Sequence, residues 1–121
     1  MATILVVDDE YGVAELFDAL LTEKGHRVLT ATNGKRGLEV LAQERADLVF
    51  LDFMMPVMGA AVMLKLMMAD PIWQKIPVVI MSVLPEKIIA MRCSGYAGIL
   101  EKPFRFSQVD DLIERLRGTS A

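Results

Sequence analysis

The stretch LVFLDFMMP, residues 48–56, decides how the fold of this chain is interpreted. Four apolar residues, Leu48 to Leu51, lead directly to the carboxylate of Asp52, and apolar residues resume after it. A short continuous apolar run is typical of a parallel strand that is covered on both faces. A carboxylate at the end of such a strand is costly to bury unless it is paired or hydrogen-bonded. The stretch therefore predicts either a structural acid with a partner or a site that attracts cations.

Apolar runs and helical patterns alternate along the whole chain. The runs expected to form strands are residues 4–7, 28–31, 48–51, 78–81 and 99–100. The expected helices are residues 13–21 with a stop at Gly25, a short helix capped by Asn33, residues 59–69, residues 85–94, and a last helix capped by Ser107. Five strand–helix units in succession predict an α/β, doubly wound (βα)5 fold, in which helices cover both faces of a five-stranded parallel sheet.

Length and composition limit the possible functions. At 121 residues, the chain is expected to form a single domain, 1–121, with a polar C-terminal tail at 117–121. The net charge of −3 gives no support for nucleic-acid binding, and no apolar run approaches the roughly 18 residues of a membrane-spanning helix. The single cysteine, Cys93, excludes an internal disulfide, and the start of the chain lacks the basic region of a secretory signal. Both features favour a cytoplasmic protein.

Polar residues interrupt the apolar pattern where the expected strands end. Asp8 and Asp9 follow the first run, Asp52 the third, Ser82 the fourth and Lys102 the fifth. Because the carboxyl ends of parallel strands share one edge, where ligands bind, we expect these side chains to meet. Three carboxylates exceed the single positive charge of Lys102. A hard divalent cation with oxygen ligands, Mg²⁺ or Mn²⁺, suits the remaining negative charge.

This set of groups is suited to phosphoryl transfer. With a metal ion in place, Asp52 is the expected nucleophile and would form an acyl-phosphate. Ser82 could hydrogen-bond one phosphoryl oxygen, and Lys102 could pair with another. The alternative for the same residues is a structural ion-pair network without chemistry.

The sequence resembles the receiver domains of two-component response regulators over nearly its whole length. VVDDE resembles the acidic pair after the first strand of that family, and LDFMMPVMG resembles its phosphoacceptor segment. IMS resembles the hydroxyl-bearing end of the fourth strand, and EKPF resembles the Lys-Pro turn after the fifth. Each motif is weak alone, but all four in this order are specific. The resemblance implies a flavodoxin-like sheet with strand order 2-1-3-4-5.

The resemblance also implies a role for each residue of the site. Asp52 would take a phosphoryl group from a sensor histidine kinase or a histidine phosphotransfer protein. Asp9, Asp52 and the backbone carbonyl of Met54 would bind Mg²⁺, with Asp8 acting through a bound water. The protein would then act through contacts with a downstream protein target and would not be an enzyme beyond this self-catalysed transfer.

The resemblance assigns Ser82 and Lys102 to switching and charge pairing. It further implies a cis peptide bond between Lys102 and Pro103, a state that proline makes accessible.

Several residues depart from the family pattern. Ile99 stands where the family usually has an aromatic residue that rotates inward on activation, which makes that switch doubtful. Val83 replaces a small residue and could narrow access to Asp52. Met54 and Leu84 occupy the positions that tune attack by water, and their apolar side chains predict slow self-dephosphorylation.

The segment AAVMLKLMMA, residues 60–69, contains one charged residue in ten. Its expected helix would turn Met63, Leu64 and Met67 towards the sheet. The apolar residues then expected to face solvent are Val62, Leu66 and Met68. An exposed apolar patch usually marks a contact surface, so we expect this helix to contribute to partner binding or to a homodimer.

Two other functions compete with the receiver interpretation. A phosphatase with an aspartyl nucleophile would need a second acid two residues after Asp52, where this chain has Met54. A flavodoxin would need a Ser/Thr-rich phosphate loop after the first strand, which is missing here. A receiver-like docking module that is never phosphorylated remains open, and Mg²⁺ binding and labelling of Asp52 would distinguish it.

Overall fold

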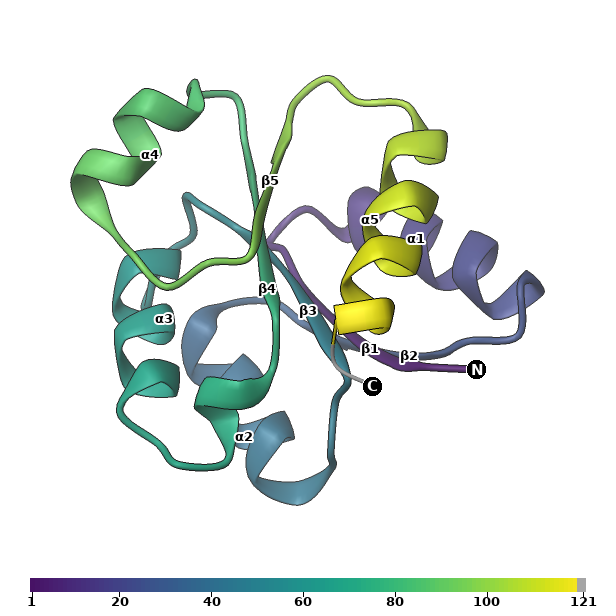
Figure 1. Cartoon of the computed structure of the whole chain (residues 1–121), viewed down its shortest axis with the longest axis horizontal. Coiled ribbons are helices and arrows are strands. Elements are labelled where there is room, and N and C mark those ends of the chain that lie inside the picture. The colour runs from purple at the N-terminus through teal and green to yellow at the C-terminus, as the bar shows by residue number, and fades with distance from the viewer. Residues whose placement is uncertain (120–121) are drawn as a thin grey trace.

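The computed structural model describes residues 1–119, in which strands and helices alternate (Figure 1). The elements in chain order are β1 (Thr3–Val7), α1 (Tyr11–Glu23), β2 (Arg27–Ala31), α2 (Gly34–Gln43), β3 (Leu48–Asp52), α3 (Ala60–Met68), the 3-10 turn η1 (Trp73–Lys75), β4 (Val78–Ser82), α4 (Glu86–Arg92), β5 (Gly98–Glu101) and α5 (Phe106–Thr119). The strands pair in parallel in the order β2-β1-β3-β4-β5. The predicted doubly wound fold and its strand order are therefore confirmed.

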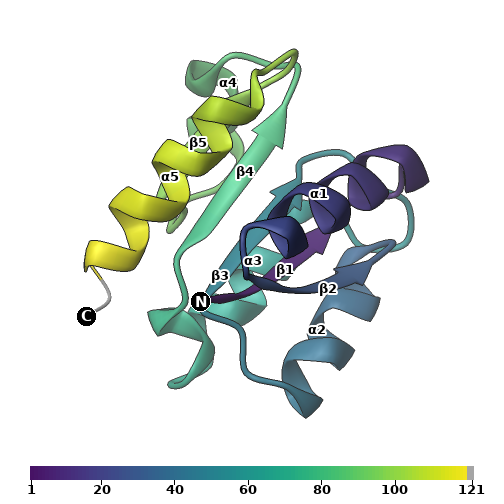
Figure 2. The ribbon, with the colours of Figure 1, turned by 90° about the vertical axis from the view of Figure 1, so that its right-hand side faces the viewer.

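Two layers of helices cover the sheet. Helices α1 and α5 lie on one face, and α2, α3 and α4 lie on the other (Figures 1 and 2). Alternate strand residues point to the two layers, so that Val49 and Leu51 pack with the α2–α4 side and Leu48 and Phe50 with the α1–α5 side. Every residue of β3 is buried, which explains its unbroken apolar run. No helix among the described residues is long and apolar enough to cross a bilayer.

The aromatic centre of the α1–α5 layer is Phe17. Its ring makes edge-on contacts with Phe50 at 5.3 Å, Phe106 at 5.3 Å and Phe104 at 6.0 Å between ring centroids. Because Phe104 follows Lys102 by two residues, these contacts tie the turn that carries the lysine to the core.

Two of the predictions of where helices begin and end are confirmed. The Asn33 side chain accepts a hydrogen bond from the Arg36 N–H at 2.9 Å, so the predicted cap of α2 is confirmed. Gly25 follows α1 with φ of +91°, a conformation that favours glycine and ends the helix as expected.

The prediction that Ser107 caps the last helix was wrong. Helix α5 begins at Phe106, and the Gln108 side chain accepts a hydrogen bond from the Arg105 N–H at 2.8 Å. Since the Gln108 N–H returns to the Arg105 carbonyl at 2.9 Å, this reciprocal pair starts the helix ahead of the serine. Helix α5 also extends to Thr119, into the expected tail at 117–121, and residues 120–121 lie outside the described part.

Helix α3 has the predicted orientation. Met63, Leu64 and Met67 are fully buried against the sheet. The side of the helix facing solvent carries Val62, Leu66 and Met68, which are 52%, 43% and 39% exposed. The exposure of this apolar patch is confirmed, whereas its role in association stays a prediction.

Val57, in the loop before α3, has a strained backbone. Its φ of +68° is unfavourable for a β-branched residue, and its side chain is 80% exposed and gains little from packing. Val57→Gly is expected to relieve about 1–2 kcal/mol of strain and to lose about 0.5–1 kcal/mol through the freer unfolded chain. Urea unfolding should therefore show a gain of up to about 1.5 kcal/mol. Val57→Ala retains the Cβ and should show no such gain; equal stabilisation by alanine would contradict the explanation.

Candidate functional site

The site lies where two central strands end. Strands β1 and β3 are neighbours, and Val7 pairs with Leu51 in their register. The next residues are Asp8, which follows β1, and Asp52, which ends β3. From β1 the chain moves to β2 on one side of the sheet and later to β3 on the other. This reversal of direction is where open parallel sheets form their ligand crevice.

Three carboxylates meet at this edge. Asp8, Asp9 and Asp52 each present an oxygen, and these oxygens all lie within 4.8 Å of one another. Asp8 and Asp52 are buried, whereas Asp9 is exposed. Oxygen donors at this spacing suit a hard divalent cation, with solvent reaching it from the Asp9 side.

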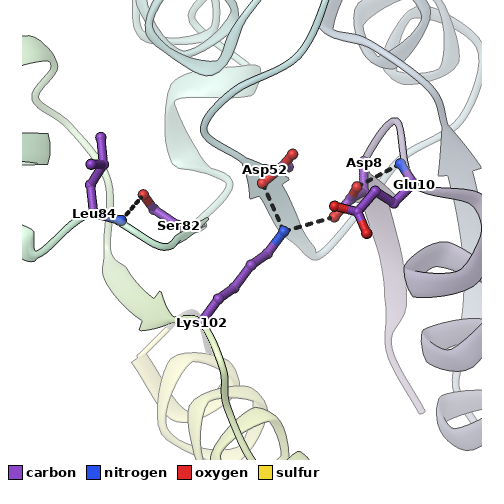
Figure 3. Close-up of polar contacts among 6 residues, drawn as sticks. All are labelled: Asp8, Glu10, Asp52, Ser82, Leu84 and Lys102. Carbon is purple, nitrogen blue, oxygen red and sulfur yellow. Dashed lines mark hydrogen bonds and ion pairs between the residues drawn. The ribbon is translucent and has the colours of Figure 1, made fainter.

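Lys102 connects two of the three acids. Its Nζ lies 3.1 Å from Asp52 Oδ1 and 3.6 Å from Asp8 Oδ2, so that the ammonium sits between the two carboxylates (Figure 3). Burial by itself would lower the pKa of Lys102. The hydrogen bond to Asp52 and the charges of Asp52, Asp8 and Glu10 together outweigh burial, and the pKa is raised. Lys102 is therefore a fixed positive charge at neutral pH.

Asp8 is only partly satisfied by the protein. Its Oδ1 accepts a hydrogen bond from the Glu10 N–H at 2.8 Å. Its Oδ2 is buried and accepts no hydrogen bond from the described residues, among which only the ammonium of Lys102, at 3.6 Å, compensates it. Burial raises the pKa of Asp8, against the lowering effect of the Glu10 N–H and of Lys102. A buried oxygen without a donor fits a site that binds a cation or a water.

The carboxyl of Asp52 titrates close to neutrality. Burial raises the pKa of Asp52 to about 6, with a further upward contribution from the charge of Asp8. The hydrogen bond from Lys102 opposes this change without reversing it. Asp52 is thus a mainly ionised and poorly compensated carboxylate at neutral pH.

Ser82 reaches the same edge but faces a different partner. It ends β4, is 3% exposed, and its Oγ accepts a hydrogen bond from the Leu84 N–H at 2.8 Å (Figure 3). The hydroxyl hydrogen is not used in that contact and can be donated to another group. The structure therefore brings Asp8, Asp9, Asp52 and Lys102 together, with Ser82 beside them and turned towards its own loop.

The remaining predicted residues surround this centre. The Lys102–Pro103 peptide is cis, as predicted. Ile99 is partly buried against the α2–α4 core. The Met54 and Val83 residues are 65% and 69% exposed. Their effect on access and on dephosphorylation stays a prediction.

Two residues at the site did not emerge from the sequence. Glu10 supplies the backbone N–H that holds Asp8, and its place in VVDDE was the available signal. Arg92, at the end of α4, lines a hollow together with Asp9, residues 53–56 and Gly59. No local pattern marks Arg92, because its position depends on how α4 lies against the loop after β3.

Comparisons with known proteins agree on one family. The family model of the response regulator receiver domain matches residues 4–116. The chain is 31% identical over 114 residues to sporulation initiation phosphotransferase F of Bacillus subtilis, a match that spans 93% of this chain and 90% of that protein. It is 32% identical to the transcriptional regulatory protein GlrR of Escherichia coli, over 94% of this chain but 27% of that longer protein. The solved structure of the response regulator TrrA of Thermotoga maritima, in complex with Mg²⁺-BeF, is 25% identical, with a TM-score of 0.85 over 96% of this chain and 99% of that one.

Proposed function

The chain belongs to the response regulator receiver domain family of two-component signalling, and on that premise we propose that it accepts a phosphoryl group on Asp52 in the presence of Mg²⁺. The proposed donor is the phosphohistidine of a sensor histidine kinase or of a histidine phosphotransfer protein. The phosphorylated state then changes the contacts of this domain with a protein target.

One observation carries the proposal: three carboxylates share a small volume with one ammonium. The oxygens of Asp8, Asp9 and Asp52 lie within 4.8 Å of one another, and Lys102 pairs with two of these acids. A structural ion pair would need only one acid for one lysine. The excess negative charge at an open edge instead suits a cation and a phosphoryl group that are bound together.

A Mg²⁺ ion, or Mn²⁺, fits these donors. The buried Oδ2 of Asp8 lacks a hydrogen-bond donor, and Asp9 opens the cluster to solvent. We propose that Asp9, Asp52 and the backbone carbonyl of Met54 hold the ion, with Asp8 acting through a bound water. When bound, the ion neutralises carboxylate charge and binds an oxygen of the incoming phosphoryl group.

Asp52 is the nucleophile of the proposed transfer. One carboxylate oxygen attacks the phosphorus atom, the P–N bond of the phosphohistidine breaks, and the imidazole leaves with the bonding electrons and takes a proton from solvent. Because the pKa of Asp52 is raised to about 6, the carboxylate is mainly ionised and nucleophilic at pH 7 and above. The product is an acyl-phosphate on Asp52.

Two side chains receive the phosphoryl oxygens. The ammonium of Lys102 already lies 3.1 Å from Asp52 Oδ1 and can pair with a phosphoryl oxygen on that carboxylate. The Ser82 hydroxyl can donate its unused hydrogen to a second oxygen, which would weaken its contact with the Leu84 N–H. That exchange would move the loop after β4 when the charge on Asp52 changes.

We propose no reaction of this domain beyond the phosphorylation of Asp52 and the slow loss of that phosphoryl group. Met54 and Leu84 have apolar side chains that cannot orient a water, so we expect slow self-dephosphorylation and no activity on other substrates.

The exposed patch of Val62, Leu66 and Met68 is the surface we propose for a protein target or a second copy. The free thiol of Cys93 is compatible with the cytoplasm as the compartment.

Incubation with acetyl phosphate tests the proposal directly. The native chain should gain the mass of one phosphoryl group when Mg²⁺ is present and should lose that gain when EDTA replaces Mg²⁺. Asp52→Asn should show no adduct, because an amide oxygen is a poor nucleophile. Intact-mass spectrometry at neutral pH measures all three results.

Asp111→Asn is the matched control, since Asp111 is an exposed carboxylate on α5, and it should label like the native chain. An Mg²⁺-independent adduct, or one that persists in Asp52→Asn, would contradict the assigned site. No adduct with acetyl phosphate, phosphoramidate or a panel of histidine kinases would favour the docking module instead.

A further inference from the structure

A hollow beside the acid cluster is lined by a positively charged side chain, that of Arg92, which has no role in the transfer proposed above. Asp9, residues 53–56 and Gly59 form its walls on one side, and Arg92 lines it from the end of α4. Because the ligand oxygens of Asp9 and Asp52 lie within 4.8 Å of each other, this hollow opens directly beside the phosphoacceptor. It is therefore a route by which a phosphorylated molecule can approach Asp52.

The negative charge of the acid cluster beside this hollow repels a phosphorylated molecule. Asp8, Asp9, Asp52 and Glu10 are acidic, and the one ammonium among them, Lys102, is already paired with two carboxylates. With Mg²⁺ bound as proposed, the four acids still exceed the ion and Lys102 by one negative charge, so a negatively charged phosphodonor is repelled by this cluster. Additional positive charge on the path to Asp52 therefore favours binding of the donor.

Arg92 is available to supply that charge. It is exposed, and no carboxylate lies within ion-pair distance of it in the part of the chain whose side chains the structure describes. A guanidinium presents several N–H donors in a plane, which matches two oxygens of a phosphate. Met54 and Pro56 form an uncharged part of the lining, which the rest of a donor molecule can contact.

We propose that Arg92 binds the phosphate of the phosphodonor in this hollow before transfer, which makes it a donor-binding residue. The inference rests on the proposed function, because it names a residue that serves the same phosphoacceptor. In the transfer from acetyl phosphate, Asp52 attacks phosphorus and acetate leaves with the electrons of the broken P–O bond. Arg92 forms no covalent bond; it holds phosphate oxygens next to Asp9 and offsets the charge of the cluster.

A simpler role for Arg92 would be stabilisation of α4. A cation in the last turn of a helix interacts favourably with the exposed carbonyls there. That role accounts for a basic residue at this position but requires no contact with a donor. The two roles differ in their dependence on donor charge and on salt, which the experiment exploits.

The test compares labelling rates of Arg92→Gln, Arg92→Lys and Lys87→Gln at pH 7.5 with Mg²⁺. Lys87 lies on the same helix and is exposed but does not line the hollow, so Lys87→Gln is the matched control. With acetyl phosphate at low ionic strength, Arg92→Gln should react about 5-fold more slowly than the native chain. Arg92→Lys should recover most of the rate, and Lys87→Gln should stay within about 2-fold of it.

The dependence on charge separates donor binding from helix stability. The loss in Arg92→Gln should shrink at high salt and should be smaller with phosphoramidate, which carries less net negative charge than acetyl phosphate. An equal loss with both donors and at all salt concentrations would overturn donor binding by Arg92. If the native chain is labelled and Arg92→Gln reacts equally fast, this inference alone is overturned. If no donor labels the native chain, the proposed function is overturned as well.

Discussion

Asp52→Asn is expected to be more stable than the native chain by about 3 kcal/mol at pH 7.5 in the absence of divalent cations. Folding raises the pKa of Asp52 from its ordinary value of 3.8 to about 6, a gap of about two pH units, each worth about 1.4 kcal/mol. Between pH 4 and pH 6 the folded state holds a proton that the unfolded state has released. The contribution of this carboxyl to the free energy of unfolding therefore falls as the pH rises through that window.

Urea unfolding from pH 4 to pH 8 measures the effect. The two proteins should be close in stability at pH 4, near the ordinary pKa of 3.8, where Asp52 is protonated in the folded chain and about half ionised in the unfolded chain, and should diverge as the pH rises. Asp111→Asn, which removes an exposed carboxylate, should stay within about 0.5 kcal/mol of the native chain throughout. Mg²⁺ should stabilise the native chain more than Asp52→Asn, because Asp52 is one of the ligands of the proposed Mg²⁺ site. A difference in stability that does not change with pH would refute this explanation.

Lys102→Met should have the opposite effect, a loss of about 3 kcal/mol at pH 7.5 without divalent cations. The lysine side chain is 18% exposed and compensates two buried carboxylates. Methionine has a similar volume but leaves Asp52 without its hydrogen bond and Asp8 Oδ2 without any compensation. The loss should be smaller at pH 5, because protonation of Asp52 then removes one of the uncompensated charges.

A double-mutant cycle isolates the contact between the two residues. In the Asp52→Asn background, Lys102→Met should cost clearly less than in the native chain, since one of the two charges that need the lysine is gone. Lys35→Met, which removes an exposed lysine on α2, should change stability little in either background. Equal losses in the two backgrounds would mean that Lys102 acts through packing and not through its charge.

Much of the fold was predictable because its signals are local. Short apolar runs bounded by turns placed each strand to within one residue of its observed ends, since strands buried on both faces tolerate few polar residues. The meeting of Asp8, Asp9, Asp52 and Lys102 followed from one rule of parallel sheets, that all strands end at the same edge. No knowledge of side-chain conformation was needed for that step.

The features that the sequence did not predict depend on contacts between distant parts of the chain, or on which of several neighbouring residues starts a helix. Ser107 is a good cap residue, but the reciprocal bonds of Arg105 and Gln108 start α5 earlier. The Ser82 hydroxyl bonds the Leu84 N–H because of the path of that loop, which no spacing in the sequence specifies. The hollow at Arg92 arises from the position of α4 against the loop after β3.

The order in which the charged residues occur along the chain has a consequence for synthesis on the ribosome. Lys102 follows Asp52 by 50 residues. At about 5–20 residues per second, translation needs roughly 3–10 s to add the lysine after the last acid. Throughout that interval the nascent chain carries all three carboxylates of the cluster and none of the ammonium that balances them. Until β5 emerges, any pairing of β1 with β3 brings these carboxylates together without Lys102, and their mutual repulsion opposes that pairing.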